Sequence, residues 1–173
     1  GRKALDTGFC TSDGRFCQMM DAKGNVLKGP VSIFTDHFMV KGLYAYILAL
    51  KRRGEKWQRE AEIAKRLTEI LFENVKRQEG LSREGIPQGF QKHAVNFMTL
   101  IVALESRKLY GDTYRSVLEE CVHKSLYEFA SDRYNKPFEY ISIPGEPLPE
   151  GPGRVIDAGH AMESLWFSMT AGL

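Results

Sequence analysis

Near the end of the chain a polar loop joins an apolar helix, in the stretch Gly153-Arg154-Val155-Ile156-Asp157-Ala158-Gly159-His160-Ala161-Met162-Glu163-Ser164-Leu165-Trp166. Positions i and i+3 of a helix lie on the same face, so we expect the carboxylate of Glu163 to hold one imidazole nitrogen of His160. The other nitrogen is then free to move a proton. The stretch therefore predicts an oriented general base at a helix start near Gly159.

Earlier parts of the chain show apolar residues at helical spacing. They predict helices from about Thr35 to before Gly54, from Trp57 to about Gln78, from about His93 to Tyr110, and from a cap at Asp112 to about Ala130. Residues 80–90, which carry Gly80 as a helix stop, are predicted to form a loop.

Two hairpins are predicted between these helices. Residues 14–28 turn at Asp21-Ala22-Lys23-Gly24, and residues 138–143 turn at Pro144-Gly145. Each is followed by a helix with a histidine, His37 and then His160, so hairpin and helix recur after about 122 residues. Antiparallel helices with short strands at one end predict a closed ring of helix pairs. Five helices cannot close such a ring, so we expect residues 1–173 to be an incomplete part of a single domain of roughly 400 residues.

Composition excludes several classes of protein. The 173 residues are 43% hydrophobic and 27% charged, which is typical of a soluble globular protein. A net charge of +2 argues against nucleic acid or a membrane surface as a partner, and no apolar run reaches the roughly 18 residues of a membrane span. Three cysteines, Cys10, Cys17 and Cys121, lack the spacing of metal ligands. A reduced, cytoplasmic setting is therefore expected.

Four landmarks resemble one known family. They are Asp13-Gly14-Arg15-Phe16 with the turn from Asp21 to Gly24; Ser32-Ile33-Phe34-Thr35-Asp36-His37-Phe38; Phe97-Met98-Thr99-Leu100; and Gly153-Arg154 followed by Gly159-His160-Ala161-Met162-Glu163. The chain is similar, over nearly its whole length, to the N-acylglucosamine 2-epimerase family, whose relatives include cellobiose 2-epimerases and aldose–ketose isomerases.

The resemblance implies an all-α fold, part of an (α/α)6 barrel that binds a small-molecule sugar in its central cleft. The family's motif falls on Gly153, Arg154, Gly159, His160 and Glu163, with Ala158 where proline is usual. Glu139 matches an acidic residue that members of the family carry on the hairpin before this motif. Thr99 stands where cellobiose epimerases have a sugar-contacting histidine, so a monosaccharide or N-acyl sugar fits better. A second catalytic histidine and a sugar-binding arginine of the family lie outside this chain.

The expected reaction is inversion at C2 of an N-acylated or free aldose. Ring opening makes the C2 proton acidic, His160 transfers it with Glu163 orienting the ring, and nearby donors disperse the charge of the enediolate. Arg154 is expected near the anionic oxygen or in a structural pair with Asp157 or Glu139. No metal or organic cofactor is required. A zinc site at His160 and Glu163 lacks a third ligand at convincing spacing.

Further residues are expected to bind substrate. Phe34 and Trp166 are predicted to lie near the sugar, while most other aromatic residues belong to the core. Asp36 is expected to reach the cleft, and Glu139 to contact substrate. His37 is a weaker candidate for a second catalytic site, and His93 and His123 are expected to be surface or partly packed residues.

Three alternatives to an epimerase remain open. An aldose–ketose isomerase would differ only in where the proton returns. An α-toroid glycoside hydrolase would need two carboxylates, for which Asp36 and Glu139 are the best pair. A non-catalytic interaction protein is the third, because the family's mammalian members also associate with a protease partner. A homodimer is left open.

Overall fold

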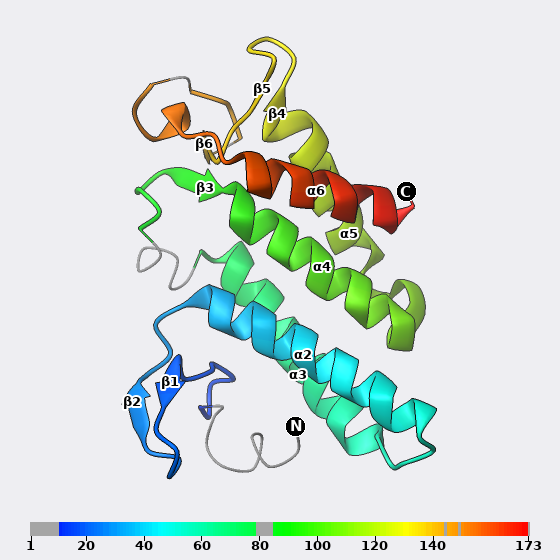
Figure 1. The fold of residues 1–173 in the computed structure, drawn as a ribbon. Helices are drawn as coiled ribbons and strands as arrows, with labels where there is room; N and C mark the ends of the chain where they lie inside the picture. The colour runs from blue at the N-terminus through cyan, green and yellow to red at the C-terminus, as the bar shows by residue number, and fades with distance from the viewer. Residues whose placement is uncertain (1–10, 79–84, 144, 149, 173) are drawn as a thin grey trace. The chain divides into compact units, whose positions relative to one another are not determined.

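A computed structural model describes residues 11–78, 85–143, 145–148 and 150–172 (Figure 1). Internal contacts divide the chain into two compact units, Gly1–Glu84 and Gly85–Leu173, and each is considered by itself. The described residues are mostly helical, as expected for an all-α chain. None of the described helices is both long and apolar enough to cross a membrane. Cys10, Gly80 and Pro144 lie outside the described residues, so the predictions that involve them are not addressed.

The first unit contains the predicted hairpin and two long helices (Figure 1). Strands β1 (Met19–Met20) and β2 (Val26–Lys28) pair antiparallel. Helices α2 (Ile33–Arg52) and α3 (Gln58–Lys76) pack on one another, close to the predicted bounds. Their apolar faces form the core of this unit, and the buried hydroxyl of Tyr44 lies 2.7 Å from that of Thr68.

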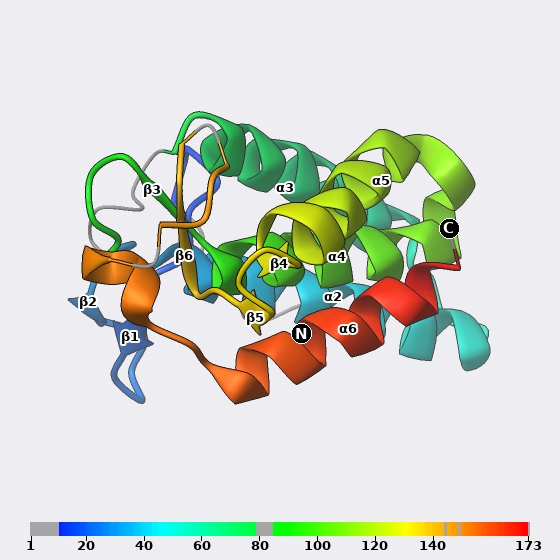
Figure 2. The same ribbon diagram turned by 90° about the horizontal axis from the view of Figure 1, so that it is seen from above.

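The second unit is built around α4 (His93–Tyr110), whose bounds match the prediction. Helix α4 lies between α5 (Arg115–His123) and α6 (Ala158–Ala171), with contacts to both (Figure 2). Its residues from Ala94 to Leu104 are all buried, which agrees with the unbroken apolar character of this helix.

The helix before the second hairpin differs from the prediction at its start, whereas its helical part ends at Glu128, close to the predicted Ala130. Asp112 does not cap it with its side chain but lies in the 3-10 turn η2 (Gly111–Tyr114), where it pairs with Arg107 Nε at 3.0 Å. Beyond α5 the chain forms a π-helical turn, η3 (Lys124–Glu128). It then enters the short hairpin of β4 (Ala130–Ser131) and β5 (Lys136–Pro137), which the sequence did not predict.

The second predicted hairpin differs from the structure in its strand pairing. Strand β6 (Tyr140–Ser142) has its strand partner in β3 (Phe90–Lys92), antiparallel and about fifty residues earlier, and across the predicted turn Ser142 N–H donates to the carbonyl of Glu146 at 2.9 Å. Ile141 of β6 is fully buried with Phe129 and Phe138, so burial of this residue holds the strand in place. A local turn signal cannot reveal a pairing that depends on a distant segment.

Candidate functional site

The start of α6 places His160 in the first turn of the helix. Asp157 is the N-cap residue, and its carboxylate accepts a hydrogen bond from the backbone N–H of His160 at 3.0 Å. This bond lowers the pKa of Asp157, with a smaller contribution from the His160 side chain. The cap fixes the first turn of α6 and therefore the direction in which the side chain of His160 points.

The imidazole of His160 is paired with Glu139. Its Nδ1 lies 2.9 Å from Glu139 Oε2, and a weaker approach of 3.5 Å joins Nδ1 to Asp157 Oδ2. The Glu139 side chain is 4% exposed, whereas that of His160 is 32% exposed. A buried carboxylate therefore holds one nitrogen of a ring that remains accessible to solvent.

Glu139 is held in place by backbone hydrogen bonds on both sides. Its carbonyl accepts from His93 N at 2.8 Å, and its N–H donates to Val155 O at 3.0 Å. Lys92 Nζ lies 3.9 Å from Glu139 Oε1, an oxygen that is buried and has no hydrogen-bond partner in the described structure. Burial raises the pKa of Glu139, and the hydrogen bond from His160 and the charges of His160 and Lys92 oppose this rise.

The expected pairing of His160 with Glu163 is not found. Glu163 is exposed, and no hydrogen bond or ion pair involving it is present among the described residues. The ring of His160 leans on Phe97 of α4, with 5.2 Å between centroids, so it is drawn toward the interior of the unit. There the nearest carboxylate belongs to Glu139. A tertiary contact has taken the place of the local i, i+3 pair.

Gly153 and Arg154 lie in the 3-10 turn η4 (Gly151–Arg154). Gly153 is buried, and a Cβ at this position would lie 1.6 Å from the carbonyl oxygen of Leu148, so only glycine fits. Arg154 is exposed and forms no ion pair with Asp157 or Glu139 in the described residues. Its guanidinium is therefore available to a ligand. Arg154 lies one residue before Val155, whose carbonyl accepts the hydrogen bond from Glu139 N–H.

No contact in the described residues joins the remaining predicted substrate-binding residues to His160. Trp166 is 65% exposed on α6, where its ring lies against Phe167. Phe34 and Asp36 belong to the first unit. Both oxygens of Asp36 are engaged there, by Arg15 Nε and by the backbone N–H of Phe16, so this carboxylate ties the hairpin segment to α2. Substrate binding by these residues stays a prediction.

His93 was expected to be a surface or partly packed residue, and this was wrong. It is 3% exposed, its Nε2 lies 2.8 Å from Ser164 Oγ, and its ring stacks on Phe129 at 4.6 Å. Burial, followed by the charge of His160, lowers the pKa of His93 to about 4. The long apolar run that follows His93 in the sequence is the signal that this helix, including its first residue, is buried.

His37 is fully buried in the first unit. Its Nδ1 donates to the carbonyl of Ile33 at 2.9 Å, and burial lowers its pKa to about 4. A fully buried, neutral imidazole is suited to packing rather than to contact with substrate. In the parts of the chain that are described, no three metal-ligating side chains lie together, so the zinc alternative gains no support.

No protein-family model matches this chain, and no curated protein matches it. The family resemblance therefore rests on the four landmarks alone. The geometry independently presents a chemical unit that can work as a general base. It consists of an accessible imidazole, a buried carboxylate on its Nδ1 and a lysine behind that carboxylate.

Proposed function

We propose that this chain carries one proton-transfer residue of a carbohydrate isomerase that inverts C2 of an N-acylated or free aldose. The observation that supports this most is the His160–Glu139 pair, in which the carboxylate leaves the second ring nitrogen free. Glu139 takes the orienting role that the sequence suggested for Glu163.

In this proposal neutral His160 donates its Nδ1–H to Glu139 and uses the lone pair on Nε2 as the base. Nε2 removes the C2 proton of the open-chain aldose, the C2–H electron pair forms the C1=C2 double bond, and the carbonyl π pair moves to O1. A free aldose gives an enediolate and an N-acylated aldose gives the corresponding 2-acylamino enolate. His160 then carries a positive charge, which the Glu139 carboxylate stabilises. The exposed guanidinium of Arg154 is a suitable donor for the enediolate oxygen. The resemblance implies that a second residue, outside this chain, returns the proton to the opposite face.

Lys92 lowers the pKa of the Glu139 carboxyl group. Its ammonium group lies 3.9 Å from Oε1 and near the ring of Tyr140, and it opposes the rise in pKa that burial causes at Glu139. This keeps Glu139 more readily ionised, and hence a better acceptor for the Nδ1–H of His160.

The proposed architecture is an (α/α)6 toroid, and the outer face of α6 supports it. Four large apolar side chains, Met162, Leu165, Trp166 and Met169, are 67%, 46%, 65% and 82% exposed. Their spacing of i, i+3, i+4 and i+7 makes one stripe, which suits the face of another helix. The same stripe favours the second candidate function, docking to a protein partner.

A glycoside hydrolase is less well supported by the geometry. Glu139 is buried and bonded to an imidazole, and both oxygens of Asp36 are bonded within the first unit. Neither carboxylate is therefore free to protonate a glycosidic oxygen or to activate water.

Solvent exchange at C2 tests the proposal. A protein that contains this chain together with the rest of the proposed toroid is incubated in deuterated buffer with a panel of free and N-acylated aldoses, and loss of the C2–H signal is followed by proton NMR. We expect exchange with at least one sugar, lost in His160→Asn and retained in His123→Asn, which changes an exposed histidine of α5. Exchange that survives His160→Asn, or glycoside cleavage without exchange, would refute it. Sugar-independent binding of a protein by a chain that exchanges no sugar would favour the second candidate.

A further inference from the structure

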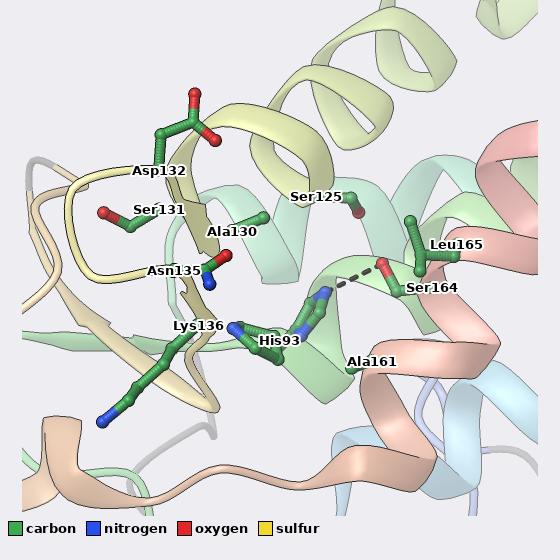
Figure 3. Close-up of a pocket in the computed structure, with 11 residues that line it drawn as sticks. His93, Ser125, Ala130, Ser131, Asp132, Asn135, Lys136, Ala161, Ser164 and Leu165 are labelled. Carbon is green, nitrogen blue, oxygen red and sulfur yellow. Dashed lines mark hydrogen bonds between the residues drawn. The ribbon is translucent and has the colours of Figure 1, made fainter.

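A cavity of about 250 Å³ lies within the second unit, beside His93 (Figure 3). Residues of α4, α6, η3 and the β4–β5 hairpin line it, and neither His160 nor Glu139 is among them. It is smaller than the roughly 300–1,000 Å³ of sites for drug-sized ligands, so it suits a compact molecule.

Uncharged polar groups form one side of the cavity. His93 Nε2 and Ser164 Oγ are joined at 2.8 Å, and both residues are buried. Ser125, also buried, accepts a hydrogen bond from Asn96 Nδ2 at 2.9 Å. Its hydroxyl proton has no acceptor in the described residues, so Ser125 can donate to a ligand.

The β4–β5 hairpin forms the opposite side. Asn135, at a φ of 50° in the turn, directs its amide into the cavity, and no hydrogen bond to that amide is present in the described structure (Figure 3). The charged ends of Asp132 and Lys136 and the hydroxyl of Ser131 point away from it (Figure 3). The interior is thus lined by neutral donors and acceptors.

The walls between these groups are apolar. They are formed by Ala130, Pro137, Ala161 and Leu165. A charged ligand would lose its hydration here without meeting an opposite charge, which is costly. A ligand with one neutral group that both accepts and donates would satisfy Ser125 and Asn135 together and place its apolar body against the walls.

We propose that this cavity is a binding site for a small uncharged ligand that carries an amide or hydroxyl group on a compact apolar body. The site is separate from the His160–Glu139 pair but adjoins it, because Phe97 contacts the rings of both His93 and His160. The proposal does not depend on sugar isomerisation.

Three probes of nearly the same shape test it: benzamide, benzoate and benzamidinium, which are neutral, anionic and cationic. Binding is followed by NMR through the imidazole of His93, with exposed His123 as an internal reference. We expect saturable shifts of His93 with benzamide and binding at least about tenfold weaker for both ions. Cyclohexanol in place of benzamide distinguishes a hydroxyl ligand from an amide. No saturable shift with either neutral probe, or equal binding of all three charge types, would overturn the proposal.

Matched variants locate the site. Ser125→Ala should weaken benzamide binding about fivefold or more, and Ser131→Ala, whose hydroxyl points outward, should leave it unchanged. Asn135→Asp keeps the shape of the side chain and tolerates the turn conformation while adding a negative charge. It should shift preference toward benzamidinium, whereas Asp132→Asn should not alter it. Because Asn135 lies on an exposed hairpin, this variant remains informative if Ser125→Ala does not fold. An Asn135→Asp protein with unchanged preference would refute the site.

Discussion

The choice between Glu139 and Glu163 as the partner of His160 has a measurable consequence for the imidazole tautomer. A hydrogen bond to an ionised group contributes about 1.5–3 kcal/mol net. At about 1.4 kcal/mol for each factor of ten, Glu139 at 2.9 Å from Nδ1 should favour the Nδ1–H tautomer by about 10- to 100-fold. Glu139→Gln replaces this with a neutral hydrogen bond of about 1 kcal/mol, a loss of about 0.5–2 kcal/mol, so the preference should fall by about 2- to 30-fold.

Nitrogen-15 NMR of the imidazole measures this preference directly, at an alkaline pH at which histidines are neutral. In the unaltered protein we expect His160 Nδ1 to carry the proton and Nε2 to be the acceptor. Glu139→Gln should move the spectrum toward a mixture of tautomers, while Glu163→Gln, which changes an exposed carboxylate on the same helix, should leave it as it is. A tautomer shift caused by Glu163→Gln and not by Glu139→Gln would refute the pairing and the role given to Glu139.

Three further predictions concern stability. Gly153→Ala should lower the free energy of unfolding by about 3 kcal/mol, at the upper end of the cost of overpacking, because the new Cβ meets the carbonyl of Leu148; urea unfolding measures this. Burial lowers the pKa of His93 to about 4 in the folded protein, against 6.5 when unfolded, so the contribution of neutral His93 to the free energy of unfolding is complete above pH 6.5. About 3 kcal/mol of it is lost as the pH falls toward 4. His93→Gln should remove this pH dependence from urea midpoints measured between pH 6.5 and 4. Asp36→Ala should cost about 3–5 kcal/mol, because it leaves the largely buried Arg15 unpaired, and thermal unfolding followed by circular dichroism should show the loss.

Each stability prediction has a matched control. Gly42→Ala, in open space within α2, should be neutral or slightly stabilising, and an equal loss in both glycine variants would contradict the steric argument. His123→Gln should leave the pH dependence of the free energy of unfolding unchanged. The raised pKa of Glu139 stabilises the folded protein at lower pH, the opposite sense to His93, and it is present in both histidine variants. Glu55→Ala breaks an exposed pair with Arg53 and should cost less than about 1 kcal/mol. A similar small loss in Asp36→Ala would show that Asp36 is not structural.

The helices were well predicted because their signal is local. Apolar residues at a spacing of three and four mark a buried face, and the bounds expected for α4 and for the start of α6 agree with the structure. The Gly24 turn of the first hairpin was found for the same reason. Errors occurred where local signals compete, as at Asp112, which resembles a cap but lies in a 3-10 turn.

The candidate site was only half predictable. The sequence pointed to His160 as a base and, from spacing along a helix, to Glu163 as its partner, whereas Glu139 was expected, from the resemblance, to contact substrate. The structure pairs β6 with β3 and thereby brings a buried Glu139 to Nδ1. It also buries His93 against Ser164, a contact between two helices that no periodicity could indicate.

What the sequence alone determined is therefore the set of helices and the presence of an imidazole with acidic residues near a helix start. Both follow from spacing within about one turn of the chain. Only the tertiary structure decided which carboxylate bonds to that imidazole and that a cavity lies beside His93. Those outcomes depend on strands and helices that are distant in sequence, and on the free energy gained by burying Ile141, Phe129 and their neighbours.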